Sequence, residues 1–472
     1  MESSRTQGFQ VLLLLGCLLF LGVKVESRRK SWSWSYDAPS CRAQSVTIAE
    51  YGGVGDGNTV NTKAFQKAID YLSGFSENGG GQLYIPPGKW LTGSFNLTSH
   101  FTLYLHKDAV ILGSEDPEEW PLIPTLPSYG IGRDGGNLRY SSLINGYNLT
   151  DVVITGDNGT VDGQGAIWWE KFHKKKLKYT RGYMVELMHS KDIVISNLTF
   201  LNSPNWNLHP VYSSNILIQH VTILAPLTSP NTDGIDPDSC SYVRIEDCYV
   251  ESGDDIVAIK SGWDEYGIAY GMPSQHIVIR RVVGVSPTSA IIALGSEMSG
   301  GIQDVQAEDI QAINSETGVR IKTSPGRGNY VRDIYVNRMT MVNMKWAFTM
   351  TGSYGAHPDN KYDPNAIPVV ERISYSNVIA TNVSTAGKLD GIQKAPFKDI
   401  CLTNVTISMA PKSKHPPWNC TNIQGVSHSV SPEPCNLLQE QPSGGEPICP
   451  RPREIDFPEQ TNFRKCSYSS RQ

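Results

Sequence analysis

The chain has 472 residues, of which 41 are Lys or Arg and 46 are Asp or Glu, so its formal net charge is −5. A protein that binds nucleic acid needs a basic domain, and this balance therefore excludes a typical nucleic-acid-binding protein. A mildly acidic protein that acts on a polyanion would instead need a local patch of basic residues.

The N-terminal segment predicts export from the cell. An apolar run over residues 11–23 has the length of a signal-peptide core and is too short for a comfortable membrane span. Val25 and Ser27 occupy the −3 and −1 positions of a plausible cleavage site. An uncleaved anchor, favoured by the basic cluster Arg28-Arg29-Lys30, is the alternative. We expect a signal peptide over 1–27, secretion, and no membrane association after cleavage.

Cysteine usage agrees with an oxidising compartment. Outside the expected signal an even number remains, mostly toward the C-terminus, which favours disulfides. A zinc site is the alternative, but no C-x-x-C pair supports it. The cysteines are Cys41, Cys240, Cys248, Cys401, Cys420, Cys435, Cys449 and Cys466. Sequons compatible with glycosylation are Asn96, Asn148, Asn158, Asn197, Asn382, Asn404 and Asn419.

The first predicted element after a linker over 28–45 is a helix over residues 62–72. Apolar residues recur there at helical spacing, so we expect an amphipathic helix that caps one end of the fold. The apolar positions are Ala64, Phe65, Ala68, Ile69 and Leu72.

From about residue 82 the hydrophobic period changes to two, and short β-branched strands return every two to three dozen residues. The members include residues 152–154, 193–195, 216–218, 243–245, 277–279, 334–336, 373–378 and 400–407. Regular return without intervening helices is typical of a β-solenoid, whose turns bury their core by stacking. Sparse hairpin signals argue against the alternative, a β-sandwich. We expect a solenoid domain over 46–410 and a disulfide-stapled Pro/Cys-rich tail over 411–472.

Three aspartates are candidates for the chemistry. Asp254 follows Asp233 by 21 residues, close to one solenoid turn, and Asp255 comes next. Gly253 would let the backbone bend so that both adjacent side chains reach one surface. Crowded carboxylates raise at least one pKa, which yields an acid and a base from the same residue type. Each motif alone would more often be structural; their order and spacing favour a site.

Two cations follow about one long turn beyond residues 287–296. Arg320 and Lys322 fall on the same face of a predicted strand. Beside three carboxylates they can hold a substrate carboxylate, with the arginine able to bind it bidentately.

The sequence resembles the polygalacturonase family of glycoside hydrolases in three motifs: Asn231-Thr-Asp-Gly-Ile-Asp236, Gly253-Asp-Asp255 and Arg320-Ile-Lys322. The resemblance runs from about residue 46 to about 410. It implies an all-β, right-handed parallel β-helix that hydrolyses α-1,4-galacturonan with inversion and needs no metal or other cofactor. The implied partner is a pectic polysaccharide of the cell wall, and we expect a monomer.

The same resemblance assigns roles to individual residues. It makes Asp254 the general acid, with Asp233 and Asp255 activating water. A galacturonate carboxylate is then bound by Arg320 and Lys322. Further substrate-binding candidates are Tyr354, Asn231 and Lys260.

One hallmark of that family is missing. Gly-His-Gly is replaced within Pro287-Thr-Ser-Ala-Ile-Ile-Ala-Leu-Gly-Ser296, so the histidine position falls at Ser289 or Ala290. His276 lies nearby but reads as an ordinary strand-start residue. His209 is either a groove residue or a structural hydrogen-bonding group. The sequence around Lys260 and over residues 295–301 resembles that of exo-acting members of the family.

Two other functions remain open from the sequence. The missing histidine allows a pectin-binding solenoid with little activity. A calcium-dependent pectate lyase shares the solenoid architecture and its acidic clusters, but the hydrolase motifs argue against it.

Overall fold

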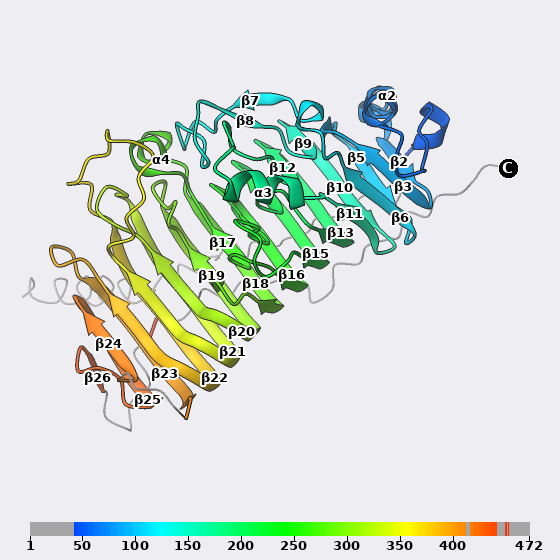
Figure 1. Ribbon diagram of the computed structural model, residues 1–472. Coiled ribbons are helices and arrows are strands. Elements are labelled where there is room, and N and C mark those ends of the chain that lie inside the picture. The colour runs from blue at the N-terminus through cyan, green and yellow to red at the C-terminus, as the bar shows by residue number, and fades with distance from the viewer. Residues whose placement is uncertain (1–41, 412–415, 441–448, 451, 453–472) are drawn as a thin grey trace, which may run out of the picture. The chain divides into compact units, whose positions relative to one another are not determined.

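The computed structural model describes residues 42–411, 416–440, 449–450 and 452, which form a right-handed parallel β-helix (Figure 1). Twenty strands belong to one parallel sheet and four to a second parallel sheet. Strands β7 and β8 form an antiparallel pair. The predicted β-solenoid is confirmed, and the sandwich alternative is wrong. The expected signal peptide, most of the linker and much of the tail beyond 440 lie outside the described residues.

The strands are β1 Gln44–Thr47, β2 Gly81–Ile85, β3 Gly88–Thr92, β4 Phe95–Asn96, β5 Phe101–Leu105, β6 Ala109–Gly113, β7 Leu122–Pro124, β8 Leu138–Tyr140, β9 Ile144–Tyr147, β10 Thr150–Gly156, β11 Gly159–Asp162, β12 Val185–Met188, β13 Lys191–Leu201, β14 Leu208–Val211, β15 Ser214–Leu224, β16 Ser241–Glu251, β17 Val257–Ile259, β18 Ser274–Val285, β19 Ala290–Leu294, β20 Ile302–Lys322, β21 Tyr330–Thr351, β22 Val369–Asp390, β23 Phe397–Met409, β24 Trp418–Thr421, β25 Ile423–Ser431 and β26 Leu438–Glu440. The helices are η1 Ile48–Tyr51, α2 Thr62–Ser73, η2 Ser76–Asn78, α3 Ala166–His173, η3 Pro117–Glu119 and α4 Asp264–Tyr270.

The core is a set of aliphatic columns that run along the coil. Strands β13, β15, β16, β18 and β20 pair in register, so the inward residues of successive turns lie directly above one another. One such column is Ile193, Ile216, Val243, Ile277 and Val305, each at most 1% exposed. Full burial of such a side chain contributes roughly 1.5–3 kcal/mol, so a long column of them stabilises the stack.

A second column forms the corners where these strands bend. Its residues have left-handed backbone, which Asn and Asp tolerate better than other non-glycine residues. The column comprises Asn197, His220, Asp247, Arg281, Asp309, Arg338, Asn377 and Asn404. Charges of opposite sign alternate within it, because Arg281 pairs with Asp247 at 2.6 Å and Arg338 with Asp309 at 2.7 Å. The stacked corners therefore carry their own ion pairs.

The predicted capping helix is confirmed as α2. All five of its predicted apolar residues are buried. The helix packs against β1, β2 and β4, and Phe65 stacks on Phe95 with ring centroids 4.4 Å apart. It thereby covers the apolar edge at the start of the coil.

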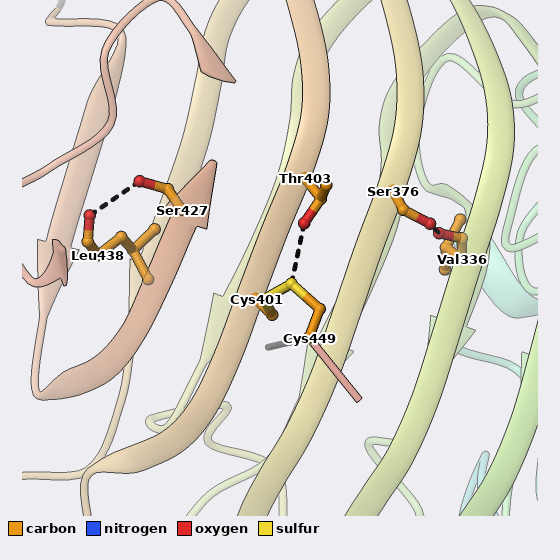
Figure 2. Close-up of a disulfide and its surroundings, with 7 residues drawn as sticks. All are labelled: Val336, Ser376, Cys401, Thr403, Ser427, Leu438 and Cys449. Carbon is orange, nitrogen blue, oxygen red and sulfur yellow. Dashed lines mark hydrogen bonds between the residues drawn. A yellow bond between two sulfur atoms is a disulfide. The ribbon is translucent and has the colours of Figure 1, made fainter. Parts of the chain in front are cut away.

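At the other end, parallel pairing continues past residue 410. Strand β25 pairs with β23, and β26 pairs with β25, where Ser427 Oγ donates to the carbonyl of Leu438 (Figure 2). The start of the expected tail therefore adds further strands to the coil. No helix among the described residues is long and apolar enough to cross a membrane.

Disulfides occur at this end, as the cysteine pattern predicted. Cys401 of β23 is bonded to Cys449, whose sulfur accepts a 2.9 Å hydrogen bond from the Thr403 hydroxyl (Figure 2). A second disulfide joins Cys420 and Cys435. The disulfide expectation does not hold for Cys240 and Cys248 near the middle of the chain, because both are buried free thiols. There they pack as small apolar residues.

Candidate active site

The three candidate aspartates lie on two consecutive turns. Asp233 lies two residues before Ile235, and Asp255 lies two residues before Val257. Ile235 and Val257 pair with each other in parallel. One oxygen from each of the three carboxylates lies within 4.8 Å of the others. The sequence-predicted cluster therefore exists, and Asp254 is its partly exposed member while the other two are buried.

Gly253 acts differently from the sequence expectation. It has no left-handed backbone; instead, a Cβ there would lie 2.2 Å from the carbonyl oxygen of Ser229. Close approach of two backbones, rather than a special bend, requires glycine at this position. The contact fixes the loop that carries Asp254 and Asp255.

Asp255 is held as an anion. Lys322 Nζ lies 2.6 Å from Asp255 Oδ2, while Oδ1 accepts hydrogen bonds from the Ser289 hydroxyl at 2.5 Å and the Ala290 amide at 3.0 Å. Burial alone would raise the pKa of Asp255, but Lys322 and Ser289 outweigh it and lower the pKa to about 2. This carboxylate is ionised across the physiological range.

Asp254 has the opposite character. Burial raises the pKa of its carboxyl to about 7, and the neighbouring charges of Asp233 and Asp255 add to the rise. No ammonium group bonds it among the described residues: Asn231 Nδ2 lies 3.5 Å from Oδ2, and the Asp255 amide donates to Oδ1 at 2.8 Å. Two adjacent aspartates thus differ by several pKa units, which provides a proton donor beside a permanent anion.

Asp233 is buried and pairs with Lys260. Lys260 Nζ donates to Asp233 Oδ2 at 3.1 Å and also lies 3.5 Å from Asp236 and 3.8 Å from Glu297. Burial raises the pKa of Asp233, although Lys260 opposes the rise. Lys260 is 2% exposed, so its ammonium is buried among these carboxylates, whereas the sequence motif predicts a substrate contact.

The remaining predicted substrate-binding residues lie beside the cluster. Arg320 stands on the outward face of β20, above the small residue Ala293 of β19, and is 23% exposed. The ring of Tyr354 lies 5.7 Å from the Arg320 guanidinium carbon and 5.6 Å from the Lys322 ammonium. Arg320 has Glu316 at 3.6 Å, a loose contact that leaves its donors available.

Asn231 faces the cluster because of a residue that the sequence did not single out. Arg181 is fully buried, and its Nη2 donates to Asn231 Oδ1 at 2.8 Å, while Asp134 accepts from Nε at 2.9 Å and from the same Nη2 at 3.2 Å. A guanidinium can only donate, so this bond directs the amide nitrogen of Asn231 toward Asp254. Nothing in the local sequence around Arg181 signals that long-range role.

His209 and His276 lie outside the cluster. His209 is fully buried between Glu186 at 3.0 Å and Asp238 at 3.3 Å, which makes it a structural hydrogen-bonding group. His276 pairs with Asp304 at 2.6 Å at the start of β18, as an ordinary strand-start residue would.

The three aspartates have a geometry that can ligate a metal ion. Two ammonium groups already occupy cation positions against this set, however, at 2.6 Å from Asp255 and 3.1 Å from Asp233. These two ammonium groups already neutralise part of the carboxylate charge, and their repulsion disfavours a divalent ion at the same place. The donor set therefore fits proton transfer better than metal binding.

Comparison with known proteins gives consistent matches. Residues 133–431 match the model of glycosyl hydrolases family 28. A probable polygalacturonase of Vitis vinifera is 61% identical over 98% of this chain and 94% of its own length. The crystal structure of a hyperthermoactive exopolygalacturonase from Thermotoga maritima covers 83% of this chain and 92% of that protein, with 29% identity and a TM-score of 0.72. A polygalacturonase structure from Erwinia carotovora, at 22% identity and a TM-score of 0.63, shows the same fold.

Proposed function

The chain belongs to family 28 of the glycosyl hydrolases, and on this premise we propose how it cleaves pectic galacturonan with the residues described above. It is a glycoside hydrolase that acts on pectin, and the proposal concerns the roles of individual groups. The observation that carries it is the contrast between Asp254, with a pKa of about 7, and Asp255, with a pKa of about 2.

Asp254 is proposed as the general acid. A carboxyl that keeps its proton up to about pH 7 can protonate the leaving glycosidic oxygen in mildly acidic surroundings. Its partial exposure lets that oxygen approach, whereas Asp233 and Asp255 are buried. Asn231 contributes by orienting this carboxyl and by presenting an amide to the substrate.

Asp233 is proposed as the main base toward water, with Asp255 in a supporting electrostatic role. Three donors engage Asp255, from Lys322, Ser289 and Ala290, and such a carboxylate is a weak base. Among the described residues, Asp233 accepts a side-chain hydrogen bond only on Oδ2, from Lys260, and its raised pKa makes it the better proton acceptor. Lys260 is accordingly proposed to adjust the charge of Asp233 rather than to bind substrate.

The proposed stereochemistry is inversion. The closest carboxylate oxygens lie within 4.8 Å, which is shorter than the ~6.5–9.5 Å between carboxyl groups of typical inverting enzymes and nearer the ~5–5.5 Å of retaining ones. Family resemblance supports inversion and the separation alone does not, so the outcome needs its own measurement. Proton NMR of the first product settles it: the β-anomer supports inversion, and the α-anomer overturns inversion while leaving hydrolysis intact.

Arg320, Lys322 and Tyr354 are proposed to bind the carboxylate and ring of one galacturonate. Arg320 is the most exposed cation of this group and has loosely engaged donors.

Exo action is proposed on the resemblance to the Thermotoga maritima exopolygalacturonase. A monomer secreted into the cell wall is the proposed form, and two disulfides support passage through an oxidising compartment.

One digestion separates the candidate functions. Mature protein is incubated with polygalacturonate, with and without a chelator, and the product lengths are resolved. New reducing ends without unsaturated sugar support hydrolysis, and monomer as the first product supports exo action. Chelator-sensitive unsaturated ends would instead identify a lyase, and binding without any product would identify a pectin-binding protein.

A further inference from the structure

A cation outside the family motifs approaches the site from a distant segment. Arg133 lies between β7 and β8, and its Nη1 is 3.0 Å from Glu297 Oε1. The other oxygen of Glu297 lies 3.8 Å from Lys260, the partner of Asp233. Three ion pairs thus connect Arg133 to Asp233, a proposed catalytic carboxylate, although about a hundred residues separate the two in sequence.

The loop presents Arg133 rigidly. The next residue, Asp134, is held by the buried Arg181 at 2.9 Å, and its amide bonds Thr180 Oγ1 at 3.0 Å. Farther back, Tyr129 donates to Asp238 at 2.6 Å. The Arg133 guanidinium lies over the ring of Trp263, with its central carbon 4.3 Å from the ring centroid. A cation fixed by its loop and by an aromatic face loses little freedom on binding a ligand.

The guanidinium is only partly used. Its side chain is 29% exposed, and Glu297 is its one ion-pair partner among the described residues. A guanidinium has five N–H donors in a planar fork that matches a carboxylate. The Trp263 ring under Arg133 donates from Nε1 to the carbonyl of Ala356 at 3.2 Å, two residues after Tyr354, so Arg133 lies near the segment that carries the Tyr354 ring.

We propose that the exposed edge of Arg133 binds the carboxylate of a second galacturonate, different from the one that Arg320 holds. The inference rests on the proposed function, because it assumes an anionic uronate chain in the site. Its consequence is specificity: the protein would require two de-esterified uronates within one bound segment, not one.

The test compares variants on defined trisaccharides. We would measure kcat/KM of wild type, Arg133→Gln, Arg320→Gln and the double variant on trigalacturonate and on its three singly methyl-esterified forms. Arg133→Gln should lower kcat/KM on trigalacturonate about 10- to 100-fold, as expected for a lost charge-assisted bond. On one esterified form, kcat/KM should be almost the same for wild type and Arg133→Gln, because the carboxylate that Arg133 binds is esterified. On a different esterified form, kcat/KM should be the same for wild type and Arg320→Gln. The double variant should lose the product of the two factors.

Three controls keep the result interpretable. Arg133→Lys retains the charge toward Glu297 but loses the planar fork, so it should recover part of the activity and all of the thermal stability. Arg338→Gln removes an exposed arginine that pairs with Asp309 in the corner column, and it should behave as wild type. The proposal would be overturned if Arg133→Gln lowered kcat/KM equally on every trisaccharide. It would also be overturned if the same esterified form removed the effects of both Arg133→Gln and Arg320→Gln.

Failure of the proposed function would look different. If wild type cleaves no trisaccharide, hydrolysis is refuted, and the same set is then compared by calorimetric binding. The second-carboxylate inference stands only if Arg133→Gln weakens binding of trigalacturonate about 10-fold or more and leaves one esterified form unaffected; any other binding pattern overturns it too.

Discussion

The hydroxyl of Ser289 donates a 2.5 Å hydrogen bond to Oδ1 of Asp255. Ser289 is 5% exposed, and the following amide donates to the same oxygen. Together with Lys322 on Oδ2, these two donors engage both oxygens of the Asp255 carboxylate.

Removal of that hydroxyl should shift the acidic limb of the pH profile. In Ser289→Ala, Asp255 loses one donor to its ionised form, so its pKa rises from about 2 and kcat falls about tenfold, or ~1.4 kcal/mol. Ser289→Thr keeps the hydroxyl and should stay near wild type. Ser289→His should give an acidic limb that follows imidazole titration near pH 6.5. An unchanged profile in Ser289→Ala would assign Ser289 to packing alone.

The general acid can be tested by substitution and by pH. Asp254→Asn should remove nearly all turnover while leaving folding and substrate binding intact, because an amide of the same shape cannot donate the proton. In wild type, kcat/KM should fall as pH rises through about 7, since the active form of Asp254 is protonated. Asp247→Asn, which alters a surface carboxylate paired with Arg281, is the matched control. Near-normal hydrolysis by Asp254→Asn would refute the assignment.

Substitution of the two cations of β20 should affect different kinetic constants. Arg320→Ala should raise KM for galacturonan, with a much smaller loss on a methyl-esterified analogue, because a bond to a carboxylate contributes about 1.5–3 kcal/mol. Lys322→Ala should also lower kcat, since Lys322 holds the pKa of Asp255 down. Steady-state kinetics on both substrates measures the difference. Equal losses for Arg320→Ala on both substrates would indicate a structural role.

His209 should make the stability of the fold depend on pH. Burial lowers its pKa, but the bonds to Asp238 and Glu186 outweigh burial, so the pKa in the folded state is raised above about 6.5. The resulting stability is fully present below pH 6.5 and is lost as pH rises through the folded value. The other groups packed against this cluster are Arg139, which pairs with Glu186, Tyr129, which donates to Asp238, and the rings of Tyr183 and Trp206.

Thermal melts from pH 5 to 9 test this dependence. They should be run in an Asp254→Asn background, because Asp254 also titrates near pH 7. His209→Gln should flatten the curve and cost roughly 3–5 kcal/mol at low pH, the cost of breaking a buried ion pair. A curve for His209→Gln parallel to that of its parent would contradict the protonated histidine.

The C-terminal strands should depend on their disulfide. Cys420–Cys435 closes a segment of 15 residues, and loss of such a cross-link removes ~3 kcal/mol by the chain-entropy model. Cys420→Ser with Cys435→Ser should lower the melting temperature and expose strands β24 and β25 to proteolysis. Cys240→Ser, which alters a buried free thiol, is the comparison. Resistance of β24 and β25 equal to wild type would show that pairing with β22 and β23 suffices.

The amino-acid sequence determined the coil and the identity of its acids. Each turn of a solenoid repeats the same aliphatic pattern, so the columns that include Ile193 and Ile216 follow from local periodicity, and the close approach of Asp233 to Asp254 follows from a separation of one turn. The helix over 62–72 was likewise predictable, because its apolar spacing is local.

Only the tertiary structure decided what surrounds those acids. Arg133, Arg181 and Glu297 lie on separate loops, whose paths no periodicity fixes, and their ion pairs join residues 37 or more positions apart. Lys260 shows the same limit, because its motif suggested a substrate contact while its neighbours Asp233 and Glu297 enclose it. The difference in pKa between Asp254 and Asp255 likewise depends on burial and on Lys322, a partner 67 residues away. Repetition specifies a backbone, but charges act through space, and their distances exist only once the chain has folded.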